Sequence, residues 1–431
     1  MKSIPDVQVE TGPQGGSSGA GGGGKVWTLS GRLLVREDEI DGDIHDWPLN
    51  GIEVKVSASD IGADGPWTEW GIGRTDAAGD FRVSEANNGR TRFLRVQARL
   101  RGADLEVEDG TQEDIGSLDV RDRNWRTVWK SETQLDGPGV SVGTRVVAAG
   151  QPFELGDTTF RQSAVVWYVV RAAMDRLAAE DAWLAMPEPV HVVYDAHGGF
   201  GVSWNSKRTI FLHRHERNSW RPRFVLHRFF LQWQREHAAG YSQNLLNKAD
   251  DFSDALALFA TNALMHELWG IPLELPLNRR AMVRTLEVST LDEVNNSTEA
   301  IQSALRLLHV ERGHGWWSHL LGTPMAYPPG QPDDDGDGSV DDRDQVGIKH
   351  RLDGRLVPDG PNHLSLWDIL QTYRANPSKG YEHAFSSGAG IYEFITRIVA
   401  IHELGDKVRI MLTRCLDPLE SAEPFEHLPK R

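Results

Sequence analysis

The hydrophobic pattern of the chain changes its period along the sequence, and this change constrains the fold more than any other feature. Between residues 26 and 130, apolar and polar residues alternate in short segments separated by Gly, Asp, Asn and Pro, as in VWTLSGRLLV, GIEVKVSAS and TRFLRVQARL. A period of two is typical of strands with one buried face. This part is therefore predicted to form a small antiparallel β-sandwich.

From about residue 160 the period becomes helical. Trp167, Val170, Met174 and Leu177 recur at spacings of three and four, which places them on one face of an amphipathic helix over 160–180. Two short strands, PVHVVYD and RTIFLHR, are expected next, and then several helices. We thus predict an α+β multidomain protein in which the sandwich precedes a mostly helical domain with a small sheet.

Three parts are expected along the chain. Residues 1–25 end in a Gly/Ser-rich run, GPQGGSSGAGGGGK, which is typical of a flexible arm. The sandwich is expected to occupy 26–135, and a Gly/Pro-containing connection leads to the helical domain at 145–425.

Charge and composition limit the partners. The chain has 46 Lys+Arg against 62 Asp+Glu, a net charge of −16, and this acidic balance argues against nucleic acid. No stretch approaches the ~18 consecutive apolar residues of a spanning helix, so no membrane span is expected. The first residues lack the apolar core of a signal peptide. The single cysteine, Cys415, excludes an intrachain disulfide and is expected to be a small buried residue.

Two short segments of the first part share a pattern. One precedes a strand and the other would close a hairpin, in which Asp76 caps its own turn, Gly79 supplies a positive φ and Phe81 returns to the core. Together they resemble the carboxypeptidase-regulatory-like, transthyretin-like fold, whose members are usually accessory or adhesive. The segments are Pro48-Leu49-Asn50-Gly51-Ile52-Glu53-Val54 and Thr75-Asp76-Ala77-Ala78-Gly79-Asp80-Phe81.

A second resemblance is carried by a strand ending at His213, a helix containing His227, and a segment with Asp254 about twenty-five residues later. This order resembles the gluzincin-type zinc metallopeptidases, in which a strand precedes a His-Glu-x-x-His helix and a second helix bears Glu-Gly-x-Ala. In an active member the two histidines and a later carboxylate bind zinc, and the Glu activates water.

Most of the catalytic residues that this resemblance implies are replaced here. His227 remains, but Arg228 stands at the position of the catalytic Glu and Leu231 at that of the second histidine, while Asp254 takes the third-ligand position. Arg228 cannot accept a proton at neutral pH, and Leu231 has no lone pair. Two candidate ligands are too few for tight zinc binding, so we predict an inactive peptidase-like domain without zinc.

Other histidines offer a possible replacement for the lost ligands. A displaced metal site could be built from His213, His215, His227 and Asp254, with Glu216 also near the strand end. The pairs His266–Glu267 and His402–Glu403 lack a second histidine, and surface or helix-capping roles are expected for them. Trp316-Trp317 could form an aromatic platform for sugar or peptide, although core packing is the simpler interpretation.

A calcium loop is the most specific motif in the sequence. Residues 333–344 fit a twelve-residue loop, with Gly338 at the sharp turn and oxygen ligands at the defined positions. Prolines just before it exclude the incoming helix of a regular EF-hand, so the loop resembles dockerin-type extracellular calcium loops. An acidic solvated loop is the alternative. The expected ligands are Asp333, Asp335, Asp337, Ser339, Asp341 and Asp344.

These observations support three hypotheses about function. The first is a calcium-binding pseudo-peptidase with a binding, adhesive or assembly role, whose sandwich contacts a protein or carbohydrate partner. The second is a metallohydrolase that uses the displaced metal site. The third is a delivered cargo or attachment protein of a larger assembly. The resemblances favour an extracellular or cell-surface location, as for bacterial-type secreted proteins, with the cytoplasm as the alternative.

Overall fold

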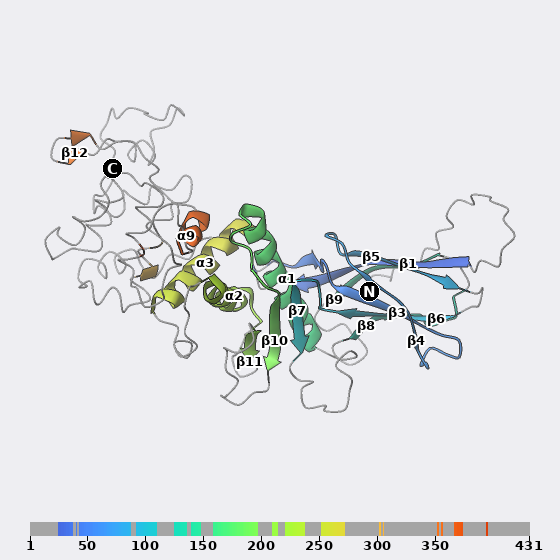
Figure 1. The fold of residues 1–431 in the computed structure, drawn as a ribbon. Coiled ribbons are helices and arrows are strands. Elements are labelled where there is room, and N and C mark those ends of the chain that lie inside the picture. Colours follow the sequence, from blue (N-terminus) through green and yellow to red (C-terminus); the bar gives the residue numbers. More distant parts are fainter. Residues whose placement is uncertain are drawn as a thin grey trace. The chain divides into compact units, whose positions relative to one another are not determined.

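The computed structural model describes residues 25–37, 40, 43–87, 92–109, 125–135, 139–147, 158–196, 209–213, 220–237, 251–271, 301–302, 305, 351–352, 355–356, 366–373 and 394. These ranges contain both strands and helices, and two sheets are largely antiparallel (Figure 1). The predicted α+β class is confirmed. None of the helices in these ranges is long and apolar enough to cross a membrane.

The first sheet is built around the long strand β1 (Lys25–Glu37). It pairs in antiparallel fashion with β2 (His45–Pro48) and with β5 (Asp80–Asn87). Strand β9 (Gly139–Val147) adds to β1 in parallel. The sequence had predicted a connection at β9 because of its glycines. The strand forms there because β1 offers it a parallel partner far away in the sequence.

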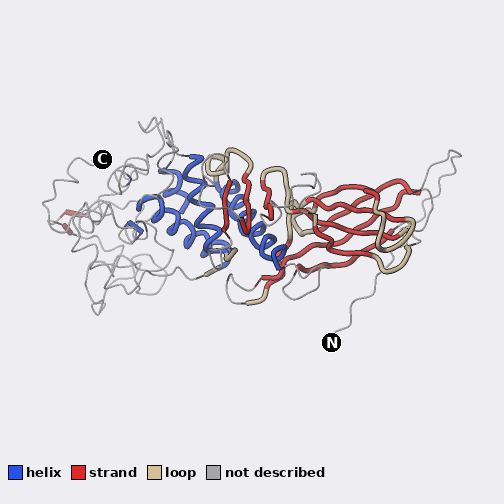
Figure 2. Tube along the Cα trace, turned by 90° about the horizontal axis from the view of Figure 1, so that it is seen from below, coloured by secondary structure: helices blue, strands red, loops and turns tan. Residues whose placement is uncertain are grey.

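The second sheet has the order β4-β3-β6-β8 and is antiparallel throughout. Its strands are β3 (Glu53–Ser59), β4 (Thr68–Arg74), β6 (Phe93–Arg99) and β8 (Arg126–Lys130). Buried and half-buried residues alternate over Glu53–Val56 of β3 and Phe93–Ala98 of β6, as in a sheet with one face on the core, while Ser57–Ser59 and Arg99 are all buried. Figure 2 shows the strands of both sheets gathered into one β-structure.

Close contacts hold the two sheets against each other. The ring of Trp27 on β1 meets that of Trp70 on β4 edge-to-face, with centroids 6.3 Å apart. Gly71 and Gly73 lie against Val83 of β5, and a Cβ on Gly71 would come within 2.8 Å of that side chain. The glycines of β4 thus allow the sheets to approach closely.

The hairpin predicted from the Thr-Asp-x-x-Gly-x-Phe segment is confirmed. Asp76 Oδ1 accepts hydrogen bonds from the backbone N–H groups of Ala78 and Asp80, each 2.9 Å long. Gly79 has φ +80°, and Phe81 is 3% exposed. The turn also rests on β1, because the N–H of Leu33 donates to the Gly79 carbonyl.

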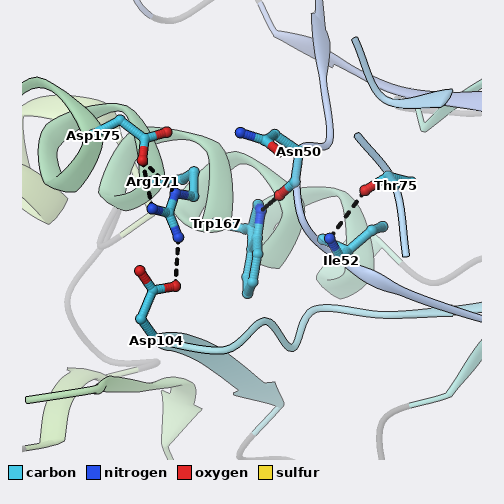
Figure 3. A network of polar contacts seen from close by, with 7 residues as sticks. All are labelled: Asn50, Ile52, Thr75, Asp104, Trp167, Arg171 and Asp175. Atoms are coloured by element: carbon cyan, nitrogen blue, oxygen red, sulfur yellow. Dashed lines mark hydrogen bonds and ion pairs between the residues drawn. The ribbon is translucent and has the colours of Figure 1, made fainter. Parts of the chain in front are cut away.

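Thr75 joins this hairpin to the Pro-Leu-x-Gly segment. Its hydroxyl donates to the Leu49 carbonyl and accepts the N–H of Ile52, and its backbone bonds both Gly51 and Ile52. The side chain is buried, so each of these groups finds its partner within the protein, and Figure 3 shows the bond between Thr75 and Ile52. One buried threonine therefore connects the two segments on which the resemblance rests.

Helix α1 (Thr158–Glu180) confirms the helix predicted over 160–180, and its predicted apolar residues are all buried. Near it lies a parallel sheet of order β11-β10-β7, formed by β7 (Leu105–Asp109), β10 (Val190–Ala196) and β11 (Thr209–His213). β10 and β11 match the two predicted strands. β7 comes from the segment that the sequence assigned to the sandwich.

Trp167 anchors the first half of α1. Its indole N–H donates to the Asn50 carbonyl at 3.0 Å, and the ring lies so close to Gly102 that a Cβ there would be 3.1 Å from it (Figure 3). One residue on, Tyr168 stacks on Trp47 of β2 with centroids 5.0 Å apart. A bulky residue at position 102 would therefore push the indole away from its acceptor.

Arg171 adds a polar contact one turn later. It donates to Asp104 at 2.6 Å and to Asp175 (Figure 3). Burial alone lowers the pKa of Arg171, but the hydrogen bonds to the two carboxylates outweigh it, and the net shift is upward. Asp104 also accepts the backbone N–H of Val190 through its carbonyl, so the same residue binds α1 and begins the pairing of β10 with β7.

Contacts between residues divide the chain into two compact units. The first comprises Met1–Asp175 and Met186–Leu226, and the second comprises Arg176–Ala185 and His227–Arg431. This division falls at other residues than the boundary expected between 135 and 145. The first unit includes β9, β10, β11 and the start of α1 because these elements pair or pack with strands from before residue 110.

The described part of the second unit is mainly helical. It contains most of α2 (Pro222–His237), α3 (Asp251–Trp269) and α9 (Leu366–Tyr373), with a short pairing of β12 (Arg351–Leu352) and β13 (Arg355–Leu356). Helix α9 is one of the helices expected in this part of the chain. Its apolar residues, including Leu366, Ile369 and Leu370, are fully buried.

We predict that Gly79→Ala destabilises the protein more than Gly51→Ala. Both glycines have positive φ, but a Cβ would lie 2.4 Å from the Leu33 carbonyl oxygen at position 79 and meet nothing within 4 Å at position 51. The free energy of unfolding should fall by about 3 kcal/mol for Gly79→Ala and by about 1 kcal/mol for Gly51→Ala. Urea denaturation measures both, and equal losses would contradict the argument.

Candidate functional site

Helix α2 forms where the sequence predicts the metal-binding helix of the peptidases. It begins at Pro222, whose fixed φ suits a first helical turn. Within the second unit its buried face is centred on Trp233, which is fully buried and donates from its indole N–H to the Leu184 carbonyl at 2.8 Å. His237 stacks on the same ring, with centroids 4.4 Å apart. The buried face also includes Leu226, Phe230 and His237, which fall at helical spacings from Trp233.

Helix α3 packs against α2 near His227, and it ends in a glycine cap. Gly270 has φ +66° and donates its N–H to the His266 carbonyl. The His266 ring bonds the Ile271 carbonyl at 2.9 Å, and Glu267 forms an ion pair with Arg176. His266 thus lies at the C-terminal end of α3, where its ring bonds the carbonyl that follows the capping glycine. His402 and Glu403 lie outside the described residues.

His227 on α2 and Asp254 on α3 are in direct contact. The distance from His227 Nε2 to Asp254 Oδ1 is 2.9 Å, and the imidazole is mostly buried while the carboxylate is about one-third exposed. An ionised carboxylate only accepts, so Nε2 carries the proton that it donates. The structure therefore brings together the first-ligand and third-ligand positions that the sequence had singled out, although they are twenty-seven residues apart.

The two replaced positions lie on the same helix. Leu231 follows His227 by four residues, so it projects on the same side of α2, and Arg228 is the next residue along. Both side chains are half-buried. The face that would hold a second imidazole ligand thus carries an isobutyl group, and a guanidinium stands beside it.

Within the residues that the structure describes, no group of three or more His, Cys, Asp or Glu side chains is arranged to hold a metal ion. The further members of the displaced site lie outside those residues: His215 and Glu216 entirely, and His213 with its side chain. The calcium loop at 333–344, Trp316-Trp317 and Cys415 also lie outside them.

A second histidine cluster, which the sequence did not suggest, lies on the parallel sheet. His191 of β10 contacts Glu108 of β7 through Nε2 at 3.1 Å and approaches the Thr209 hydroxyl of β11 at 3.4 Å. The side-chain hydrogen bond from His191 lowers the pKa of Glu108, although burial opposes it. In the sequence the three residues are only polar members of strand patterns, and the parallel pairing alone brings them together.

Comparisons with known proteins identify no family. No protein family and no curated protein matches the sequence. Among solved structures, a 9R-lipoxygenase from Cyanothece PCC8801 is 17% identical at TM-score 0.19, with 36% of this chain covered. The dioxygenase domain of a dioxygenase carbohydrate-binding protein fusion from Streptomyces sp. SirexAA-E is 20% identical at TM-score 0.15, covering 33% of this chain and 97% of that domain.

The chain spans 24% of the lipoxygenase's length. At TM-scores this low, neither likeness identifies a shared fold or a shared activity. The functional argument therefore rests on the residues of the chain itself.

The Glu108 carboxylate should stabilise the fold in a pH-dependent way. Because its pKa is lower in the folded protein than its ordinary value of 4.5, the stabilisation is complete above about pH 5 and is lost as the pH falls through the folded pKa. We predict that Glu108→Gln lowers the free energy of unfolding by about 0.5–1 kcal/mol at pH 7, as for a partly exposed hydrogen bond to a carboxylate. The difference from the parent should disappear in acid.

Urea denaturation at a series of pH values measures this difference. Glu69→Gln, which removes an exposed carboxylate of β4, is the control for the loss of surface charge. A pH-independent difference between Glu108→Gln and the parent would contradict the assignment.

Proposed function

We propose that the chain is a metallopeptidase-like protein without catalytic activity, which binds calcium and acts by holding a partner. The contact between His227 and Asp254 carries this proposal. It joins two helices at the positions where the resemblance puts two metal ligands, while Arg228 and Leu231 occupy the other two positions of the motif.

The number of ligands argues against zinc at this place. A peptidase zinc site needs three protein ligands and a water. Here His227 donates from Nε2 to Asp254, so Nε2 has no lone pair for a metal and at most Nδ1 carries one. Zinc binding through Nε2 would require this hydrogen bond to break, and Leu231 has no lone pair with which to replace a ligand.

The chemistry of water activation argues in the same direction. A general base next to the metal must accept a proton near neutral pH. The guanidinium of Arg228 stays protonated and would place a positive charge beside a dication. The helix can keep its packing without the site, since its apolar face is fully buried around Trp233.

The displaced metallohydrolase site is the second candidate. Two of its four proposed ligands, His227 and Asp254, are already adjacent, and this observation favours it. The two candidates differ in whether the protein needs a transition metal, so metal binding separates them.

The binding role is assigned to the β-sandwich. Its two signature segments resemble those of accessory and adhesive domains, and the buried Thr75 links the two segments. Together with the expected calcium loop, these features support a location outside the cell or at its surface.

We predict that restoring the motif restores metal binding. The double variant Arg228→Glu/Leu231→His should bind about one zinc ion per chain, because it adds a second imidazole on the His227 side of α2. The parent and Arg228→Glu alone should bind zinc at least about a hundredfold more weakly, since each lacks a ligand that contributes several kcal/mol. Isothermal titration calorimetry and metal analysis of the dialysed proteins measure this.

The same experiment separates the two candidates. Stoichiometric zinc in the parent, lost in His227→Ala together with a zinc-dependent peptidase activity, would overturn the non-catalytic assignment. Failure of the double variant to bind zinc would instead contradict the proposal that α2 and α3 are arranged as in a metallopeptidase zinc site.

Calcium should stabilise the whole chain through the loop at 333–344. At a calcium concentration about a hundredfold above Kd, the gain is about 2.7 kcal/mol, which raises the melting temperature by several degrees. Chelation should reverse the shift, and the paired substitution Asp333→Asn/Asp335→Asn should abolish it. A melting temperature that does not respond to chelation would exclude the calcium loop.

A further inference from the structure

Strand β9 contains an irregularity that determines where one of its side chains points. The pairs Ser30↔Ser141 and Arg32↔Thr144 join β1 to β9, and between them β1 has a single residue where β9 has two. Such an extra residue is a β-bulge, which interrupts the alternation of a strand and redirects the side chains that follow. Gly143, inside the bulge, has φ +64°, a backbone conformation that glycine adopts without strain.

The bulge turns Arg145 toward the core side of the sheet. Before the bulge, Val140 is buried and pairs with the buried Leu29. After the bulge, Arg145 pairs with Leu33, which is also fully buried. Successive side chains of a regular strand point to opposite sides, so strict alternation from Val140 would have directed Arg145 outward. The extra residue therefore places an arginine on the side of the sheet that otherwise carries apolar residues.

The guanidinium of Arg145 is half-buried and lacks an acidic partner. Within the part of the chain that the structure describes, no hydrogen bond or ion pair engages this side chain, and its Nε is buried without an acceptor. Burial lowers the pKa of the Arg145 guanidinium. A buried donor without an acceptor costs free energy, and the cost is larger for a charged group. Arg145 thus has a donor available for an acceptor from outside these residues.

Two other arginines of the same sheet show which acceptor fits. Arg32 donates from Nε and Nη2 to the two carboxylate oxygens of Asp80, and Arg36 bonds Asp46 in the same way. These hydrogen bonds hold the pKa values of both aspartates below their usual range. The planar guanidinium matches a carboxylate in this two-bond geometry. Because the Nε of Arg145 is unbonded, a carboxylate is the ligand that suits it.

The charge of the chain limits this ligand to a small anion. A net charge of −16 opposes the approach of a polyanion, and a single arginine compensates one negative charge. The side chain of Arg145 is only half-buried, so a ligand can reach it from solvent. A monocarboxylate meets both conditions.

The simpler interpretation is an arginine that only packs its methylene stem. Long basic side chains often bury the stem and keep the charged head in water. In that case the Nε–H would be hydrated, whereas the Nε of Arg145 is itself a buried atom. The burial of this donor, together with the bulge that directs it, favours a binding role.

We propose that Arg145 binds a monocarboxylate at the β9 side of the sandwich, with the bulge at Gly143 directing the guanidinium and Nε donating to the carboxylate. The ligand is a free carboxylic acid or the acidic side chain of a bound peptide, since both present the same group. Both residues belong to the first unit, so the site is independent of the peptidase resemblance.

Calorimetric titration of the full chain with benzoate, at constant ionic strength in chloride, tests the proposal. Benzoate should bind the parent at one site per chain. Arg145→Met should weaken binding at least about tenfold, the usual contribution of a hydrogen bond to a charged group. Arg145→Lys should weaken it severalfold, because lysine keeps the charge and has no Nε–H at this place. Arg82→Met, which removes an exposed cation from β5, should bind like the parent.

Two further probes test the chemical class and the source of the ligand. Benzamide, a neutral analogue of benzoate, should not bind. An acetylated and amidated glutamate that binds more tightly than benzoate would identify a peptide side chain as the ligand, and weaker binding would identify a free acid. Equal binding of benzoate by the parent and Arg145→Met, or the absence of binding, would overturn the proposal.

Melting of the ligand-free protein provides a second readout. Arg145→Met should leave the melting temperature unchanged or raise it, because it replaces an uncompensated charge by an apolar side chain of similar length. Arg36→Met, which breaks the pair with Asp46, should lower it by about 1–3 °C. A loss in Arg145→Met as large as that in Arg36→Met would show that the guanidinium already has a partner, and would contradict the proposal.

Discussion

The first unit depends on the place where Trp167 meets the strands. Its indole donates to the Asn50 carbonyl and fills the space left by Gly102, and one turn later Arg171 bonds Asp104. A buried indole N–H without its acceptor, or a cavity in place of the ring, would each cost several kcal/mol. The helix, the sandwich and the β7–β10 pairing therefore form together, since Asp104 takes part in both contacts.

The second unit has a similar dependence on a polar contact between helices. His227 of α2 and Asp254 of α3 form a direct hydrogen bond, from imidazole to carboxylate, between the two helices. Removal of either partner would leave the other buried polar group unsatisfied. The buried apolar residues of this unit include Trp233 of α2.

The outer faces of the two sheets hold their cations in different ways. On one sheet, arginines and aspartates bond each other across neighbouring strands. On the other, Lys55 and Arg95 lie over tryptophan rings. Because strand alternation assigns the buried and exposed side chains independently, the outer surface can change while the valines between the sheets stay the same.

Local rules predicted much of this protein from its sequence. The period of two over 26–130, the helix with Trp167, the strands at 190 and 209, and the Asp76–Gly79 turn all appear as expected, because each depends on residues close together in the chain. The sequence also identified His227 and Asp254 through their order relative to a known motif. It did not predict that β9 is a strand, since its glycines resemble a connection and the strand with which it pairs, β1, is distant in the sequence.

Tertiary structure decided everything that requires two distant segments to meet. Parallel pairing of β7 with β10 crosses the boundary that composition indicated, and it alone brings Glu108, His191 and Thr209 together. The register between β3 and β6 likewise determines that Lys55 and Arg95 are diagonal neighbours. The physical reason is the same in each case: sequence periodicity states which side of an element is buried, whereas the choice of neighbour follows from how whole elements pack.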